Sequence, residues 1–174
     1  MDKLPRRKNI RLKGYDYSQA GYYFITICTK DRQKLFGEIV GAGDPACPRI
    51  VGADDPVRPE PFMKSNEIGK MVYDCWNKIN DIYNNVMTGA FCLMPNHIHG
   101  IVVISGGGQS RPPLPKIIQG YKSVSTRMCF KYNIKTIWQR NYYDRIIRNE
   151  HEYLKACEYI ENNPLKWVED KYYI

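Results

Sequence analysis

The sequence predicts an α+β fold in which a mainly antiparallel sheet carries helices packed on its faces. Three observations support this prediction. The 174 residues are enough for one domain with a real core. Segments of strand-like and helix-like pattern follow one another in the order strand, helix, strand, strand, helix, strand, helix. Two of the strands are joined at Pro95-Asn96, and so short a connection indicates an antiparallel hairpin.

The predicted strands are short segments rich in β-branched and aromatic residues. They span residues 22–29, 86–94, 98–104 and 142–147, with a weaker extended segment at 35–40. Between them, residues 41–63 contain five prolines, which cannot donate hydrogen bonds to a strand ladder. We therefore expect a single domain over residues 1–174 with an inserted surface loop at about 41–63.

Helical periodicity of apolar residues predicts the helices. The first covers residues 65–83 and the second residues 116–131, after a loop rich in glycine and proline at 105–115. Asn149 followed by Glu152 has the spacing of a capping box and predicts the start of a last helix. Asn163-Pro164 would end that helix.

The chain is basic, with 26 Lys+Arg against 18 Asp+Glu and a net charge of +8. Such an excess favours a polyanionic partner, nucleic acid before membrane. The 14 tyrosines offer flat surfaces for unstacked bases, although most of them will pack in the core. The basic residues within 3–13 form either a solvated tail or an arm that lies against phosphates; at this point both interpretations stand equally.

The sequence indicates no secretion or membrane insertion. Its N-terminal residues lack an apolar signal-peptide region, and no apolar run approaches the roughly 18 residues that a membrane span requires. The six cysteines are scattered without CxxC pairs, so neither a zinc ribbon nor a disulfide framework is expected. We therefore expect a cytoplasmic protein.

The strongest chemical signal is His97-Ile98-His99 at the start of the predicted strand 98–104. Successive strand side chains point to opposite faces, so His97 and His99 emerge together while Ile98 packs on the other side. Two imidazoles on one face make half of a divalent-metal site. A simple hydrogen-bonding role at a strand end is the alternative, but the chain has only three histidines and two of them are here.

Further candidate groups lie on the last helix. Tyr159 and Asn163 are four residues apart and share a face. If that face covers the imidazoles, the Asn163 carbonyl oxygen could join His97 and His99 in binding Mg²⁺ or Mn²⁺. Tyr159 would then be the candidate nucleophile for phosphoryl transfer, which forms a phosphotyrosine.

The residues alone leave other assignments open. Packing in the core is the commoner role for a tyrosine such as Tyr159. Tyr142, Tyr143 and Tyr153 are rival phenols, His151 is a rival third metal ligand, and Glu152 either caps the helix or reaches the metal.

Several motifs together resemble single-tyrosine HUH transposases, in which two histidines flank a bulky apolar residue. The matching stretches are GYDYSQAGYYFITICTKDRQKLFGEI, MPNHIHGIVVI, LPKIIQGYKSVSTR and IWQRNYYDRIIRNEHEYLKACEYIENNPLKW, which leave out chiefly residues 41–63. Within this class, the chain is most similar to the REP-associated tyrosine transposases, relatives of insertion-sequence transposases.

The resemblance implies an HUH endonuclease fold with a ferredoxin-like palm, the metal ligands His97, His99 and Asn163, and the nucleophile Tyr159. It also implies single-stranded DNA near a hairpin as the substrate, cleaved with a 5′-phosphotyrosine link and a free 3′-OH, by a monomer or a homodimer. The expected phosphate contacts are Arg6, Arg7, Lys8, Arg11, Lys122 and Arg127.

Two other functions stay open at this point. A hairpin-binding DNA or RNA module could keep the fold without turnover. A hydrolytic metallonuclease could cut without forming a covalent adduct.

Overall fold

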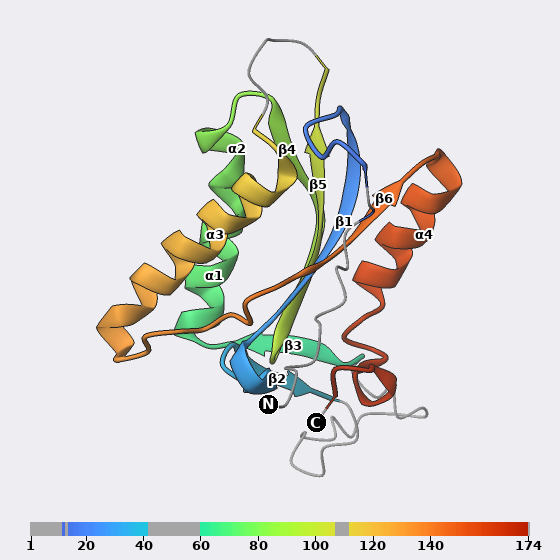
Figure 1. Ribbon diagram of the computed structural model, residues 1–174. Helices are drawn as coiled ribbons and strands as arrows, with labels where there is room; N and C mark the ends of the chain where they lie inside the picture. The colour runs from blue at the N-terminus through green and yellow to red at the C-terminus, as the bar shows by residue number, and fades with distance from the viewer. Residues whose placement is uncertain (1–11, 13, 42–59, 107–111, 174) are drawn as a thin grey trace, which may run out of the picture.

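The computed structural model describes residues 12, 14–41, 60–106 and 112–173. Its centre is a four-stranded antiparallel sheet with the strand order β4-β5-β1-β6 (Figure 1). The strands are β1 (Gly21–Cys28), β4 (Val86–Met94), β5 (His97–Ile104) and β6 (Tyr143–Ile147). The expected hairpin of β4 and β5 turns at Pro95 and Asn96.

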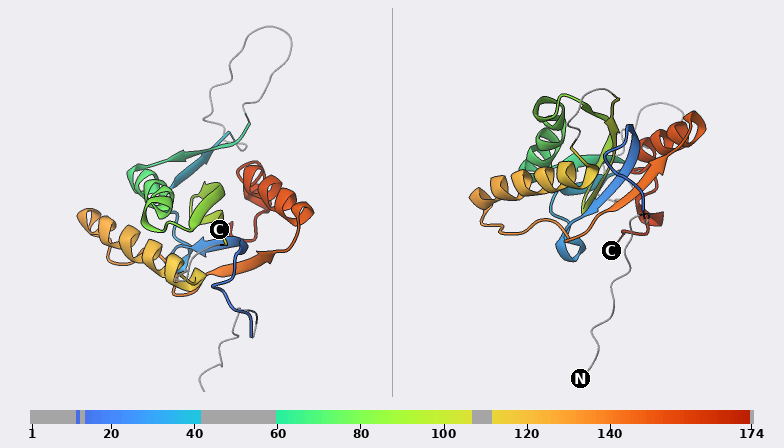
Figure 2. Two further views of the ribbon diagram at one scale, coloured as in Figure 1. Left: turned by 90° about the horizontal axis from the view of Figure 1, so that it is seen from above. Right: turned by 45° about the horizontal axis from the view of Figure 1, so that its top comes forward.

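Helices cover both faces of this sheet. α1 (Glu67–Asn77), α2 (Ile79–Ile82) and α3 (Leu114–Met128) lie on one side, and α4 (Glu150–Glu161) lies on the other (Figures 1 and 2). Short 3₁₀ turns occur at Lys30–Arg32, Cys129–Tyr132 and Trp167–Glu169. The predicted α+β class is confirmed. Among the described helices, none combines the length and the apolar character that crossing a membrane requires.

A separate two-stranded ribbon pairs β2 (Gly37–Val40) with β3 (Phe62–Ser65). Phe62 and Met63, which fall within the predicted inserted loop at 41–63, therefore belong to a strand. Residues 42–59 of that loop lie outside the described residues.

The larger core lies between the sheet and the helices α1 and α3. It buries Ile98 and Val102 of β5 against Trp76 of α1, whose side chain is fully buried. The indole ring packs directly on Gly100, where any Cβ would overlap it. Glycine at this position allows the helix to approach the sheet closely.

The smaller core lies between the sheet and α4 and contains Ile101, Ile147 and Ile160. Because β5 side chains alternate between faces, His97 and His99 point to this side together with Ile101. The register of the sheet therefore places the histidine pair under α4.

The predicted helix over residues 65–83 is wrong at its start and is interrupted. Ser65 ends β3, and Asn66 caps α1 by accepting a hydrogen bond from the Gly69 amide at 2.9 Å. The side-chain cap fixes the first helical turn after Asn66. Lys78 then separates α1 from the single turn of α2.

Candidate active site

His97 and His99 lie side by side on β5, and both are buried, with 0% and 1% of their surface exposed. Their Nε2 atoms are 3.0 Å apart. Two ligand atoms at right angles on one six-coordinate Mg²⁺ ion, each at about 2.1 Å, also lie about 3 Å apart. The spacing of the imidazole nitrogens therefore suits a shared divalent cation.

The Nδ1 atoms of the two imidazoles form hydrogen bonds with neighbouring side chains. Asn96 donates from Nδ2 to the Tyr172 carbonyl at 2.8 Å, so its Oδ1 accepts from His97 Nδ1, also at 2.8 Å. Thr26 lies opposite His99 in the sheet register, and its Oγ1 is 2.8 Å from His99 Nδ1. A proton on His97 Nδ1 leaves a lone pair on Nε2, as metal binding requires.

Tyr159 reaches the histidine pair from α4. Its hydroxyl lies 3.5 Å from His99 Nε2, and its ring packs edge-on against His99 and Phe24. Its side chain is nevertheless 44% exposed, so the phenol stands at the border between the buried site and solvent. The expected approach of this helix to the imidazole pair is present in the structure.

Asn163 lies just beyond the end of α4 and is 3% exposed. Its Oδ1 is buried and accepts no hydrogen bond from the described part of the chain. A buried carbonyl oxygen without a donor is costly unless something else compensates it. The Asn163 side chain acts on the pKa values of both His97 and Tyr159, so this buried oxygen lies where a hard divalent cation held by the imidazoles would need a further ligand.

A carboxylate that sequence reasoning missed joins this group. Asp170 Oδ2 lies 3.8 Å from His97 Nε2, and its side chain is 2% exposed. Ligand atoms of Asp170, His97 and His99 all lie within 4.8 Å of one another. Asp170 follows the last 3₁₀ turn in a charged stretch without periodicity, so no sequence pattern marked it.

Burial keeps the imidazoles neutral. It lowers the pKa of His97 to about 3, and the positive charges of Lys171 and Arg32 act in the same direction. Burial also lowers the pKa of His99 well below its usual value, helped by its neighbour His97. Neutral imidazoles are the form that binds metal.

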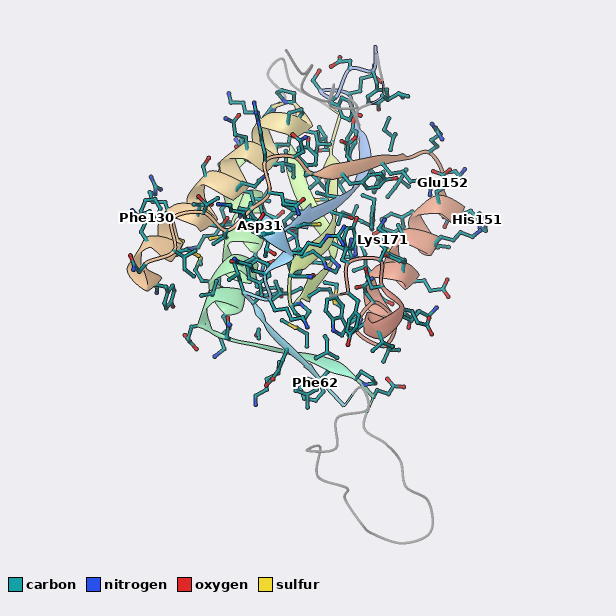
Figure 3. All side chains as sticks on the ribbon, turned by 60° about the horizontal axis from the view of Figure 1, so that its bottom comes forward. Asp31, Phe62, Phe130, His151, Glu152 and Lys171 are labelled. Carbon is teal, nitrogen blue, oxygen red and sulfur yellow. The ribbon has the colours of Figure 1, made fainter. Side chains whose placement is uncertain are left out.

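The environment of Tyr159 is mixed. Burial raises the pKa of its phenol, and the Asp170 carboxylate adds to this effect. The positive charge of Lys171 and, after it, the side-chain amide of Asn163, which donates toward the phenol oxygen, lower the pKa. Figure 3 shows Lys171 between α4 and the sheet.

A cavity of about 340 Å³ opens beside Tyr159 and His99. Its remaining polar lining combines three cationic side chains with a hydroxyl, a phenol and a carboxylate. They are Arg145, Lys155, Lys171, Thr26, Tyr143 and Glu152. The cations give this cavity the charge that a phosphate needs.

The rival residues lie elsewhere or have other roles. His151 is exposed on the outer side of α4 (Figure 3), and Glu152 accepts a hydrogen bond from the Arg148 amide at 3.0 Å. Tyr153 packs against Tyr22, and Tyr142 lines a cavity against α3 on the opposite face of the sheet. Tyr143 lines the Tyr159 cavity, but within the described ranges it makes neither a hydrogen bond nor a ring contact with the histidine pair.

The predicted DNA contacts are dispersed. Arg6, Arg7, Lys8 and Arg11 lie outside the described residues. Lys122 and Arg127 both line the cavity between α3 and residues 138–142, on the sheet face opposite Tyr159. Lys122 donates to the main-chain carbonyls of Gln139 and Arg140, so it also anchors this loop.

The family model described as "Transposase IS200 like" matches residues 60–163, which contain β4, β5, β6 and α4. The chain belongs to the IS200-like transposase family. This membership confirms the resemblance seen in the sequence motifs.

A sequence relative and a solved structure are similar to this IS200-like transposase. An uncharacterised protein of Haemophilus influenzae is 34% identical over 190 residues, which cover 98% of this chain and 95% of the relative. The structure of a REP-associated tyrosine transposase bound to a REP hairpin aligns with a TM-score of 0.56 and 18% identity, over 98% of this chain and 77% of that one. The transposase thus shares its fold with that protein.

Proposed function

We propose that this transposase is a metal-dependent endonuclease and strand transferase acting on single-stranded DNA near hairpins, with Tyr159 as the nucleophile. The observation that carries the proposal is the position of the Tyr159 hydroxyl, 3.5 Å from Nε2 of one of two adjacent buried histidines. The Tyr159 ring packs on Phe24 and His99, while its hydroxyl is directed to the imidazole pair and is open to solvent. This position fits covalent catalysis at a phosphate.

His97, His99 and Asn163 would hold Mg²⁺ or Mn²⁺. Two imidazole nitrogens and an orphaned carbonyl oxygen form a donor set that such ions accept, with positions left for phosphate and water. When bound, the ion would polarise the scissile phosphate and offset the negative charge that develops on it. Thr26 and Asn96 keep the two rings oriented for this task.

The Tyr159 oxygen attacks phosphorus and passes its phenolic proton to solvent water, which its partly exposed position admits. The bond from phosphorus to the 3′ oxygen breaks, that oxygen takes up a proton, and a free 3′-OH leaves. The 5′ phosphate stays on Tyr159, so the energy of the bond is kept for rejoining. Lys171, Lys155 and Arg145 line the adjacent cavity and would bind the phosphate oxygens.

One chain carries all of these groups. His99 and Tyr159 approach each other within the same molecule, so we propose that a monomer has a complete site, whether or not it also forms a homodimer.

The proposed DNA substrate rests on charge and on the relative. The net charge of +8 suits a polyanion. The REP-associated transposase with the same fold is bound to a hairpin. Arg6, Arg7, Lys8, Arg11, Lys122 and Arg127 remain our proposed phosphate contacts.

The test is incubation of a 3′-labelled library of hairpin oligonucleotides with the protein and Mn²⁺, followed by denaturing gel electrophoresis. We expect labelled DNA linked to protein, abolished by Tyr159→Phe and kept by Tyr153→Phe on the same helix. Retention of hairpins without cleavage would instead indicate a non-catalytic binding module. Cleavage without an adduct that survives Tyr159→Phe would indicate a hydrolytic metallonuclease.

A second variant separates chemistry from binding. His97→Ala should abolish the adduct and leave most of the hairpin affinity, because the substitution removes none of the proposed phosphate contacts. An equal loss of affinity in a salt titration would contradict this division.

A further inference from the structure

The contacts that the Asp170 carboxylate makes with the rest of the protein do not explain why it is buried. Its Oδ1 accepts a hydrogen bond from the Tyr172 amide at 2.7 Å, which fixes the side chain. Its Oδ2 faces His97 Nε2 at 3.8 Å, and the side chain is almost fully buried. A buried carboxylate needs a positive partner or a full set of donors.

His97 is a poor partner in this arrangement. Because its Nδ1 donates to Asn96, its Nε2 carries a lone pair in the neutral ring, and this lone pair faces the Asp170 oxygen. Among the described residues, no lysine or arginine nitrogen makes an ion pair with Asp170. The Nε2 lone pair and the Asp170 oxygen thus face each other in a buried site. The Asn163 side chain lies next to His97, and its Oδ1 accepts no hydrogen bond from the described residues.

We infer that Asp170 is a further ligand of the divalent cation, supplied by the C-terminal segment rather than by α4. This inference rests on the metal dependence proposed above and adds one negative charge to the two neutral imidazoles and the neutral amide. An anionic oxygen favours hard divalent cations such as Mg²⁺ and Mn²⁺ over the softer ions that imidazoles alone would select.

The same contact has a structural consequence. The segment 167–173 covers the histidine pair: the rings of Trp167 and Tyr172 lie 6.0 and 4.7 Å from the His97 ring. Ligation by Asp170 would tie this segment to the ion. Metal binding should therefore protect it, independently of any DNA cleavage.

The first test measures Mn²⁺ affinity in the absence of DNA, by electron paramagnetic resonance or calorimetry. Asp170→Asn keeps an oxygen for the Tyr172 amide but loses the charge, and we expect its affinity to fall about tenfold or more. The matched control is Glu169→Gln, which removes an exposed neighbouring carboxylate and should bind as the wild type does. His97→Ala serves as the reference for a lost site.

Three outcomes are distinct. Equal affinity of Asp170→Asn and wild type, with loss in His97→Ala, would overturn the inference while leaving the proposed function intact. Absence of Mn²⁺ binding in the wild type would overturn both. A selective loss in Asp170→Asn supports the inference.

The second measurement guards against misfolding. In the presence of a metal chelator, Asp170→Asn should melt at or above the wild-type temperature, because the substitution removes a buried charge. If Asp170 had a purely structural role, the substitution would lower the melting temperature.

Trypsin cleavage after Lys166 and Lys171 should slow several-fold on Mn²⁺ addition in the wild type but not in Asp170→Asn. Equal protection in both proteins would overturn the inference.

Discussion

Thr26 and His99 are direct cross-strand partners, and the Thr26 hydroxyl lies 2.8 Å from Nδ1 of the imidazole. The pair links the central strand β1 to the side of β5 that carries both histidines. Outer-sphere partners of this kind fix the ring orientation of a ligating histidine.

Thr26→Val should therefore weaken the site without unfolding the protein. Valine keeps the shape and removes the hydroxyl, so we expect Mn²⁺ affinity and adduct formation to fall about 10–100-fold. The free energy of unfolding should fall by about 1 kcal/mol, the usual contribution of one hydrogen bond. Thr126→Val on α3, on the opposite face of the sheet, is the control; an equal effect there would remove Thr26 from the site.

Removing residues 3–11 should weaken hairpin binding and flatten its dependence on salt. The slope of log K against log[salt] should become shallower by about 0.7–0.9 for every phosphate that the shortened protein no longer neutralises. Arg127→Gln should make the same slope shallower by about 1. Fluorescence anisotropy at several salt concentrations measures both, and an unchanged slope after truncation would show that this basic segment does not contact DNA.

The stability of α4 should depend on pH through Glu152. A hydrogen bond from the Arg148 amide lowers the pKa of Glu152 below its usual value, with smaller contributions from the positive charges of Arg145 and Arg148. The folded state thus holds the proton less tightly than the unfolded state, and stability from this group is present above about pH 4.5 and lost as pH falls through the lowered pKa.

Glu152→Gln isolates this charge, because glutamine still offers an oxygen to the Arg148 amide. We expect a lower melting temperature than the wild type at pH 7 and no difference near pH 3. Glu150→Gln, in the same helical turn, controls for the helix dipole. A difference between Glu152→Gln and wild type that persists at pH 3 would contradict the assignment.

Gly100→Ala should destabilise the fold. The new methyl group would overlap the buried Trp76 ring, and overpacking of this kind costs about 1–3 kcal/mol. Gly106→Ala is a suitable control, since a Cβ there meets only Ala20 Cβ at an ordinary 3.9 Å. Urea denaturation of both variants measures the difference, and equal midpoints would show that α1 can shift on the sheet.

The parts of the site that follow short-range periodicity could be predicted. Alternation along a strand puts His97 and His99 on one face, and the spacing of Tyr159 and Asn163 puts them on one helical face. The cap at Asn149 was likewise predictable: its Oδ1 accepts from the Glu152 amide at 2.9 Å. The Glu152 side chain does not complete a capping box, because it accepts a hydrogen bond from the Arg148 amide and not from the Asn149 amide.

Long-range placement could not be derived from periodicity. Asp170 reaches His97 only because the chain turns back after α4, and no local pattern encodes that turn. Lys122, an expected phosphate contact, donates to main-chain carbonyls of the following loop. Such contacts depend on how separate elements pack, which the order of residues within one element does not reveal.

Because β1 lies in the middle of the sheet, any fragment that is to fold on its own must include it. The family match begins at residue 60, yet β1, which precedes it, is hydrogen-bonded to β5 on one side and β6 on the other. A fragment limited to residues 60–163 would therefore lose the strand that bridges its two halves, leaving β6 with no neighbour in the sheet and His99 without its hydroxyl partner.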